Sequence, residues 1–174
     1  NGAISGTQII IGTPTGNSKI DEAKLRLRLD GSHDEQTAVL RDGNIIYIGG
    51  QTARAALYAT YTFLSDVLGV RWLWPGADGE FIPKRSVVSV DELSIFEVPS
   101  IRTRSLTNVN STDPQTGTWQ ARNKMNMVAI NRNADGNSPA IKELSKKGFQ
   151  IRIAGHFVVL PESILSAHPE YAAL

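Results

Sequence analysis

The stretch of sequence that decides the fold class spans residues 51–85 and reads QTARAALYATYTFLSDVLGVRWLWPGADGEFIPKR. Its first part has small or apolar residues at the spacing of one helical face, namely Ala53, Ala56, Leu57, Thr60, Leu64, Val67 and Leu68. Thr52 can cap the start of this helix, and Gly69 stands where a left-handed residue commonly ends one. The spacing predicts that Leu64 is buried against a sheet, while Thr62 lies on the opposite face of the helix.

The first half of the chain has further segments with strand character around this helix. Residues 21–29 alternate leucine with lysine or arginine, which is the period-two pattern of a half-buried strand. Asp42 and Gly43 form a pair typical of a tight hairpin. The expected strands are 7–11, 21–29, 37–40, 44–48, 70–74 and 86–90. We expect residues 1–95 to form an α+β domain in which the long helix covers one face of a mixed sheet.

The pattern changes near Pro99, because the residue before a proline favours extended geometry and indicates a connector. Strands and helices then alternate, as they do in parallel sheets with crossover helices. The expected strands are 101–106, 127–131 and 149–154, and the expected helices are 118–124 and 138–148. The predicted fold class is therefore α/β: an α+β accessory domain at residues 1–95, then the first βαβ units of a TIM-like barrel at residues 100–174, truncated after about three strands.

The composition is that of an ordinary globular protein and excludes several classes. Of the 174 residues, 41% are hydrophobic and 20% charged, and 18 basic against 17 acidic side chains give a net charge of +1. This balance provides no electrostatic footprint for nucleic acid, and no apolar run approaches the roughly 20 residues of a membrane span. With 0 cysteines, the chain has no disulfide, thiol nucleophile or cysteine-based zinc site.

Two groups of motifs carry a resemblance to known proteins. ALYATYTFLSDVLGVRWLWPG at residues 56–76, followed by GEFIPK, resembles the N-terminal domain that precedes the catalytic barrel in family 67 α-glucuronidases and β-hexosaminidases. WQARNKMN at residues 119–126, AGHF at 154–157 and HPEYAAL at 168–174 complete a resemblance to bacterial glycan-degradation proteins of domain of unknown function 4838. The likeness covers nearly the whole chain.

This resemblance implies a protein that degrades or binds glycans, with its sugar site over the C-terminal ends of barrel strands. It also implies that paired catalytic carboxylates belong to later barrel strands, which this chain lacks. The chain departs from the family wording at Ala154, where a glycine is usual, and at Val158, where a threonine is usual. Both positions fall in the loop that would face the sugar.

The candidate substrate-binding residues are His156, Arg104 and Asn131. His156 follows Gly155 directly after the third expected barrel strand, where barrel enzymes place ligand groups. Arg104, with Arg102 on the same side of the first expected strand, can present a guanidinium to a uronic acid carboxylate. The alternatives are a histidine satisfied by neighbouring backbone, an arginine in an interdomain ion pair or at an exposed edge, and an asparagine that forms a turn.

No catalytic pair is visible, so the catalytic residues are unknown. Glycoside hydrolysis needs two carboxyl groups on either side of one bond. Each acid of the second half has a structural explanation; these acids are Asp113, Asp135, Glu143, Glu162 and Glu170. The 3 histidines are scattered and lack partners at ligand spacing, so no metal site and no cofactor are expected. Trp72 and Trp74 are interpreted as core residues rather than as a sugar-stacking surface.

The expected function is that of an N-terminal fragment of a glycoside hydrolase-like protein that acts on complex glycans, including uronic-acid-containing ones. The fragment itself is expected to be inactive. The alternative is a non-catalytic carbohydrate-binding or structural support domain. Expected partners are a glycan ligand and the remainder of the barrel, with neither nucleic acid nor a membrane span. Asn1-Gly2-Ala3 is neither a signal peptide nor a natural start, so the chain looks trimmed. We expect a periplasmic or secreted protein whose signal peptide has been removed.

Overall fold

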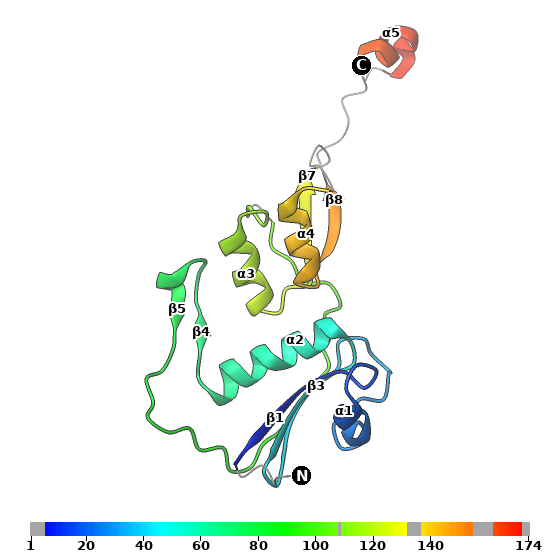
Figure 1. Ribbon diagram of the computed structural model, residues 1–174. Helices are drawn as coiled ribbons and strands as arrows, with labels where there is room; N and C mark the ends of the chain where they lie inside the picture. The colour runs from blue at the N-terminus through cyan, green and yellow to red at the C-terminus, as the bar shows by residue number, and fades with distance from the viewer. Residues whose placement is uncertain (1–5, 108, 132–136, 155–161, 172–174) are drawn as a thin grey trace.

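The computed structural model describes residues 6–107, 109–131, 137–154 and 162–171, except for the side chains of residues 131, 154 and 162 (Figure 1). The strands are β1 (Gln8–Gly12), β2 (Thr37–Asp42), β3 (Ile45–Gly50), β4 (Arg71–Trp72), β5 (Glu80–Phe81), β6 (Ser94–Glu97), β7 (Met127–Asn131) and β8 (Gln150–Ala154). The α-helices are α1 (Ser18–Ala23), α2 (Ala53–Thr62), α3 (Pro114–Arg122), α4 (Pro139–Lys146) and α5 (Glu162–Ala167). The α/β class is confirmed.

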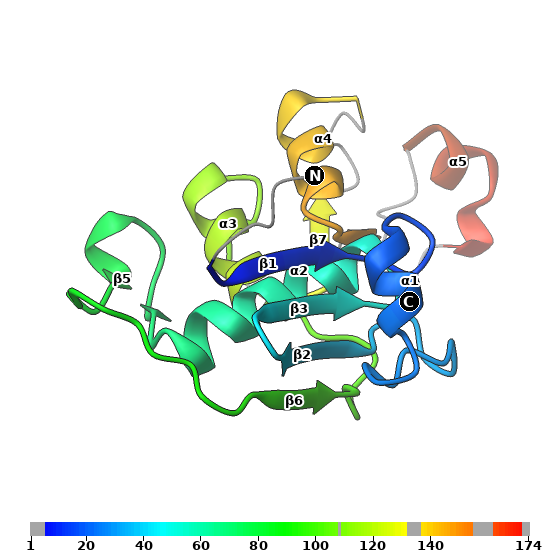
Figure 2. The ribbon, with the colours of Figure 1, turned by 60° about the horizontal axis from the view of Figure 1, so that its bottom comes forward.

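A four-stranded mixed sheet in the order β1-β3-β2-β6 forms the base of the structure (Figure 2). β1 runs parallel to β3, whereas β2 is antiparallel to both β3 and β6. The predicted hairpin joins β2 to β3, and Gly43 adopts the left-handed φ of 59° that such a turn requires. β6 was not expected, and the strand expected at residues 86–90 does not form. Instead, Ile95 and Phe96 of β6 pair with residues of β2 and so belong to the sheet.

Helix α1 and the turns that follow it cover one face of this sheet, so the strand expected at residues 21–29 is wrong. Asn17 caps the helix by accepting a hydrogen bond from the backbone N–H of Lys19 at 3.0 Å. The leucine alternation comes from tight turns through residues 24–29, in which Arg28 has a left-handed φ of 54°. The residues that pack in this layer are Ile10, Ile20, Ala23, Leu27, Leu29, Ala38 and Tyr47.

Helix α2 covers the other face, and it begins where Thr52 accepts a hydrogen bond from the backbone N–H of Ala55. It continues into a π-helical segment, η1 (Phe63–Val67), which changes the direction of the following side chains. Phe63 therefore enters the core, whereas Leu64 is only half-buried. The expected helical face was wrong for Thr62, which is 1% exposed and donates to the Glu97 carboxylate at 3.0 Å.

A second layer of packing lies on the side of α2 that faces away from the sheet (Figure 1). There α3, α4 and the parallel pair β7–β8 share a core that includes Ala121, Val128, Leu144 and Phe149, with Tyr61 of α2 packed against it. β7 forms as expected, and α4 begins at its expected cap, Ser138. The strand expected at residues 101–106 does not form, because this segment is an extended connector that hydrogen-bonds to the start of β7.

Helix α2 is therefore sandwiched between the mixed sheet and the β7–β8 unit. A helix covered on two sides needs small or apolar residues around most of its circumference, which explains why a one-face pattern describes it poorly. The described residues contain a two-stranded parallel sheet where a barrel was expected. Within the same residues, no helix combines the length and apolar character needed to cross a bilayer.

Candidate functional site

The candidate site is built around Glu35, whose carboxylate is buried between the two packing layers. Glu35 belongs to the loop of residues 30–36 that leads into β2, and its backbone N–H donates to Nδ1 of His33 at 3.0 Å. Asp30 organises this loop by accepting hydrogen bonds from the backbone N–H of Ser32 at 2.9 Å and from Nε2 of Gln36 at 2.5 Å. These bonds lower the pKa of Asp30 to about 2.

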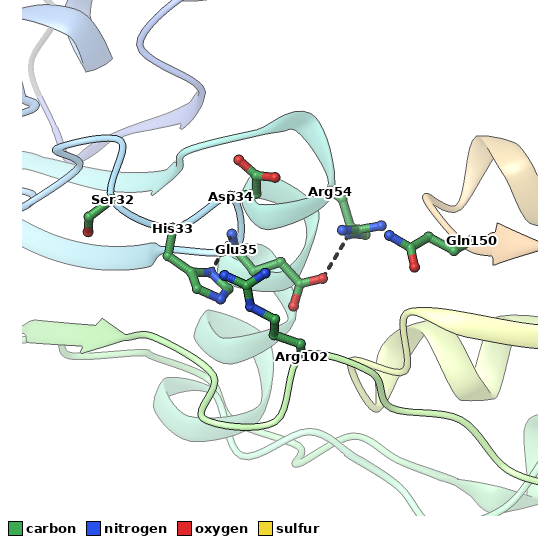
Figure 3. A pocket seen from close by; sticks show the side chains of 7 residues that line it. All are labelled: Ser32, His33, Asp34, Glu35, Arg54, Arg102 and Gln150. Carbon is green, nitrogen blue, oxygen red and sulfur yellow. Dashed lines mark hydrogen bonds and ion pairs between the residues drawn. The ribbon is translucent and has the colours of Figure 1, made fainter.

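Three side chains from distant parts of the chain converge on the Glu35 carboxylate. Arg104 donates from Nη2 to Oε2 at 2.5 Å, and Asn126 donates from Nδ2 to Oε1 at 2.8 Å. Arg54, on α2, forms an ion pair between its Nε and Oε1 at 3.0 Å, which Figure 3 marks. The hydrogen bonds from Arg104 and Asn126 are charge-assisted, the strong kind in a protein interior, whereas Arg54 Nε contributes an ion pair without hydrogen-bond geometry. The carboxylate therefore fastens the β2 loop to α2 and to the segment that enters β7.

The two arginines are held in place by backbone oxygens as well. Arg54 donates to the carbonyl of Gly148 at 3.0 Å, just before β8. Arg104 donates to the carbonyls of Lys124 at 2.9 Å and Ile101 at 2.7 Å. The bonds to Gly148 and Lys124 join separate parts of the chain, so the cluster links the mixed-sheet layer to the β7–β8 unit.

Tyr58 completes this junction from α2. Its hydroxyl donates to the carbonyl of Met125 at 2.8 Å, and the Arg104 guanidinium lies 5.9 Å from the centre of its ring. Burial, and after it the negative charge of Glu35, raise the pKa of Tyr58 to about 12. The phenol is therefore a neutral hydrogen-bond donor at physiological pH.

Two hollows open beside Glu35. The smaller one has a volume of about 200 Å³ and is lined by Ser32, His33, Asp34, Glu35, Arg54, Arg102 and Gln150 (Figure 3). The larger has a volume of about 550 Å³ and lies beside Tyr58, Glu97 and Lys124. Within the described residues, the Arg102 guanidinium at the smaller hollow makes no hydrogen bond or ion pair. Arg102 is therefore the group that can bind a carboxylate, while Glu35 is already neutralised.

Of the three predicted substrate-binding residues, the structure describes Arg104 and the backbone of Asn131, which lie at opposite ends of β7. The backbone carbonyl oxygen of Arg104 accepts a hydrogen bond from the backbone N–H of Met127 at 3.2 Å, so Arg104 lies at the start of β7. Asn131 ends the same strand, roughly 13 Å away at the rise of a parallel strand. His156 lies outside the described residues. The guanidinium of Arg104 binds the Glu35 carboxylate, which corresponds to the alternative of an ion pair rather than a ligand contact.

The described acids of the second half have structural roles. Asp113 caps α3 by accepting from the backbone N–H of Thr116 at 2.8 Å, and this bond lowers its pKa. Glu143 pairs with Lys146, which lowers the pKa of its exposed carboxyl. Glu170 contacts His168 at 3.0 Å. Asp135 lies outside the described residues. Among the residues that the structure describes, no group of histidines and acids is arranged to hold a metal ion.

The core interpretation of the tryptophans is wrong for Trp74, which is 50% exposed. Trp72 is half-buried, with its ring edge-on to Tyr61 at a centroid distance of 5.5 Å. Trp119 donates from Nε1 to the Trp72 carbonyl at 3.0 Å, so the indole ties α3 to β4.

Sequence reasoning missed the Glu35 cluster. One signal was present: Arg54 is the one charged residue between Gln51 and Ser65, in a stretch that otherwise reads as core. A lone charge in such a stretch indicates a buried partner, because an unpaired buried charge is very costly. The identity of that partner follows only from the tertiary structure.

Comparisons with models of protein families and with curated proteins give no match for this chain.

Proposed function

We propose that this chain is the N-terminal part of a bacterial glycoside hydrolase-like protein that acts on complex glycans, including those that contain uronic acids. Residues 1–95 would form an accessory domain that resembles the one preceding the barrel in family 67 α-glucuronidases and β-hexosaminidases. Residues from about 100 onward would supply the first strands of a barrel-like domain. In this proposal the protein is periplasmic or secreted.

The observation that carries the proposal is the β7–α4–β8 unit. Its two strands pair in parallel along their whole length, from Met127 with Gln150 to Asn131 with Ala154. Parallel sheets occur almost only where both faces are covered, yet Ile153 on β8 is 69% exposed. We therefore interpret β7 and β8 as part of a larger parallel sheet, in which further strands would cover the exposed side of β8. The remainder of a barrel in the parent protein would supply those strands.

The sugar site is proposed at the C-terminal ends of these strands, where ligand groups gather in parallel α/β architectures. Asn131 ends β7, and Gly155 and His156 follow β8. Asn131 and His156 would contact sugar hydroxyls there. Arg104 would support the site from the opposite end of β7, because its guanidinium is bound to Glu35.

A non-catalytic support or binding role is the second candidate, and the Glu35 cluster favours it. The cluster joins two packing layers through a buried carboxylate, which is what a domain that props up a neighbouring barrel would need. The described carboxylates Asp113 and Glu143 already form a helix cap and an ion pair, respectively.

Calorimetric titration of the complete parent protein with glucuronoxylan oligosaccharides tests the proposed site. His156→Ala should weaken binding by about 1–3 kcal/mol, the scale of leaving a polar partner unmet, with little change in melting temperature. His168→Ala is the matched control, because this exposed histidine stacks on Tyr171 and contacts Glu170. A large fall in the melting temperature of His156→Ala with unchanged affinity would assign His156 a structural role.

A further inference from the structure

The 3 tryptophans of this chain meet in one groove, although Trp72 and Trp119 are 47 residues apart. The groove lies between the β4–β5 hairpin and α3, and it has a volume of about 330 Å³. This volume is at the lower end of the range of small-molecule sites, about 300–1,000 Å³. Beside the three indoles, its polar lining residues are Glu80, Gln115, Thr118 and Arg122.

The groove is formed in advance by contacts between the hairpin and the helix. Trp72 offers its carbonyl to Nε1 of Trp119 at 3.0 Å and to Nδ2 of Asn123 at 3.2 Å. The hairpin itself is closed tightly, because a Cβ at Gly79 would meet the Trp74 carbonyl oxygen at 2.1 Å. A ligand would therefore find the aromatic walls already positioned, which lowers the entropic cost of binding.

Trp74 is the side chain that packing leaves unexplained. Half of its surface is exposed at the groove, whereas Trp72 is covered on one ring face by Arg122 at 5.5 Å. Gln115 is exposed and lines the same groove as Trp74, and within the described residues its side chain forms no hydrogen bond. An exposed indole next to an unengaged amide offers an apolar face and hydrogen-bonding groups to the same ligand.

The charges at the groove favour a neutral ligand. Arg122 and Glu80 form an ion pair at 3.5 Å, and Glu80 also accepts from Nε1 of Trp72 at 3.2 Å. The pair cancels its own charge, yet it still presents donors and acceptors that hydroxyl groups can use. The flat C–H face of a pyranose ring can cover an indole while its hydroxyls reach such polar neighbours. A neutral saccharide unit matches both features.

A proline-rich peptide is another ligand that aromatic grooves bind. Such a peptide needs donors for its backbone carbonyls, and indole N–H groups are suited to that role. Here the N–H groups of Trp72 and Trp119 already donate to Glu80 and to the Trp72 carbonyl. Of the three indoles, only Trp74 has an N–H group without a hydrogen bond within the described residues. The groove therefore offers ring faces more than indole donors, and this favours a sugar.

We propose that the groove between the β4–β5 hairpin and α3 binds a neutral pyranose unit of an oligosaccharide, with Trp74 as the stacking platform and Gln115, Glu80 and Arg122 as hydroxyl partners. This site is separate from the one proposed at the ends of β7 and β8. It does not depend on the parent protein being a hydrolase.

Calorimetric titration of the 174-residue chain with cellohexaose and with xylohexaose tests this proposal. We expect saturable binding of at least one of the two, weakened on the order of tenfold or more by Trp74→Ala, which corresponds to about 1.4 kcal/mol or more. Trp74→Phe should retain part of the affinity. Phe81→Ala is the matched control, because Phe81 is 57% exposed on β5 and does not line the groove. Circular dichroism confirms that each variant is folded.

Several results would overturn the proposal. One is that neither oligosaccharide binds, and another is that Phe81→Ala weakens binding as much as Trp74→Ala does. Binding of decaproline through Trp74 without binding of either sugar would identify a peptide site. Loss of cellohexaose and xylohexaose binding in His156→Ala, with Trp74→Ala unaffected, would place the sugar at the ends of β7 and β8 instead. That last result would leave the proposed function standing.

Discussion

Glu35 and Arg104 are 69 residues apart in the sequence, yet Oε2 of one lies 2.5 Å from Nη2 of the other. Arg54 binds the second oxygen of the same carboxylate, so one buried acid joins the loop before β2, helix α2 and the approach to β7. This arrangement holds the mixed sheet and the β7–β8 unit in contact. Loss of the Glu35 carboxylate should therefore lower the stability of the whole structure.

Glu35→Gln is expected to lower the free energy of unfolding by roughly 3 kcal/mol. The reason is that two arginines, each about 20% exposed, would lose the charge that compensates them. Urea unfolding followed by circular dichroism measures this change. Glu143→Gln is the control, because this exposed carboxylate should tolerate the change with little loss of stability. Equal effects of the two variants would contradict a special role for Glu35.

Phe63→Ala should destabilise the protein by about 3–5 kcal/mol, because Phe63 packs between α2 and the sheet. Leu64→Ala should cost only roughly 1 kcal/mol, since half-buried Leu64 lines a surface hollow. Thr62→Ala should cost about 1 kcal/mol through the hydrogen bond lost with Glu97. Melting temperatures of the three variants test this order. A larger loss for Leu64→Ala than for Phe63→Ala would contradict the burial of Phe63 by the π-helical segment.

Tyr58 should make the stability depend on pH in alkaline solution. Its pKa is raised to about 12 in the folded state, against about 10 when unfolded, so the folded state holds the phenolic proton more tightly. This stabilisation is complete below pH 10 and is lost as the pH rises through 12. From pH 9 to 12, the unfolding free energy should fall by roughly 1–2 kcal/mol more than in Tyr58→Phe. Parallel pH profiles of the two proteins would contradict this.

Gly50→Ala should be strongly destabilising, by roughly 3 kcal/mol or more. A Cβ at this position would lie 2.0 Å from the backbone nitrogen of Ala56, where the start of α2 crosses the end of β3. Gly43→Ala is the matched comparison, because its Cβ would meet open space and only its φ of 59° opposes the change, at about 1 kcal/mol. Chemical denaturation of both variants checks the difference, and a smaller effect at Gly50 would contradict the close helix–strand crossing.

The 174-residue chain should show no glycosidase turnover above background on aryl glycosides or glucuronoxylan oligosaccharides. The paired carboxylates that hydrolysis needs would belong to later strands of the proposed barrel. Reducing-sugar release measures this, with the complete parent protein as the comparison. Robust hydrolysis by the pure chain would show that an acid within these residues is catalytic.

Local chemistry explains which parts of the fold the sequence predicted. The hairpin at Gly43 and the caps at Thr52 and Ser138 depend on residues within a few positions of each other, and all three are present in the structure. The strand expected at residues 21–29 was wrong because alternating leucines are equally compatible with a helix followed by tight turns. The alternation of residues indicates which side chains are buried, but not whether the segment is a strand or a helix followed by turns.

The sequence by itself determined the α/β class, the β7–α4–β8 unit and the starts of α2 and α4, because caps, turns and alternation are short-range effects. The tertiary structure alone decided which faces of α2 are covered and which charges meet. Glu35, Arg54 and Arg104 come together because three elements distant in the chain pack against one another. Trp74 is exposed beside Trp119 for the same reason: burial depends on what the rest of the chain places against a side chain, and no local pattern encodes that.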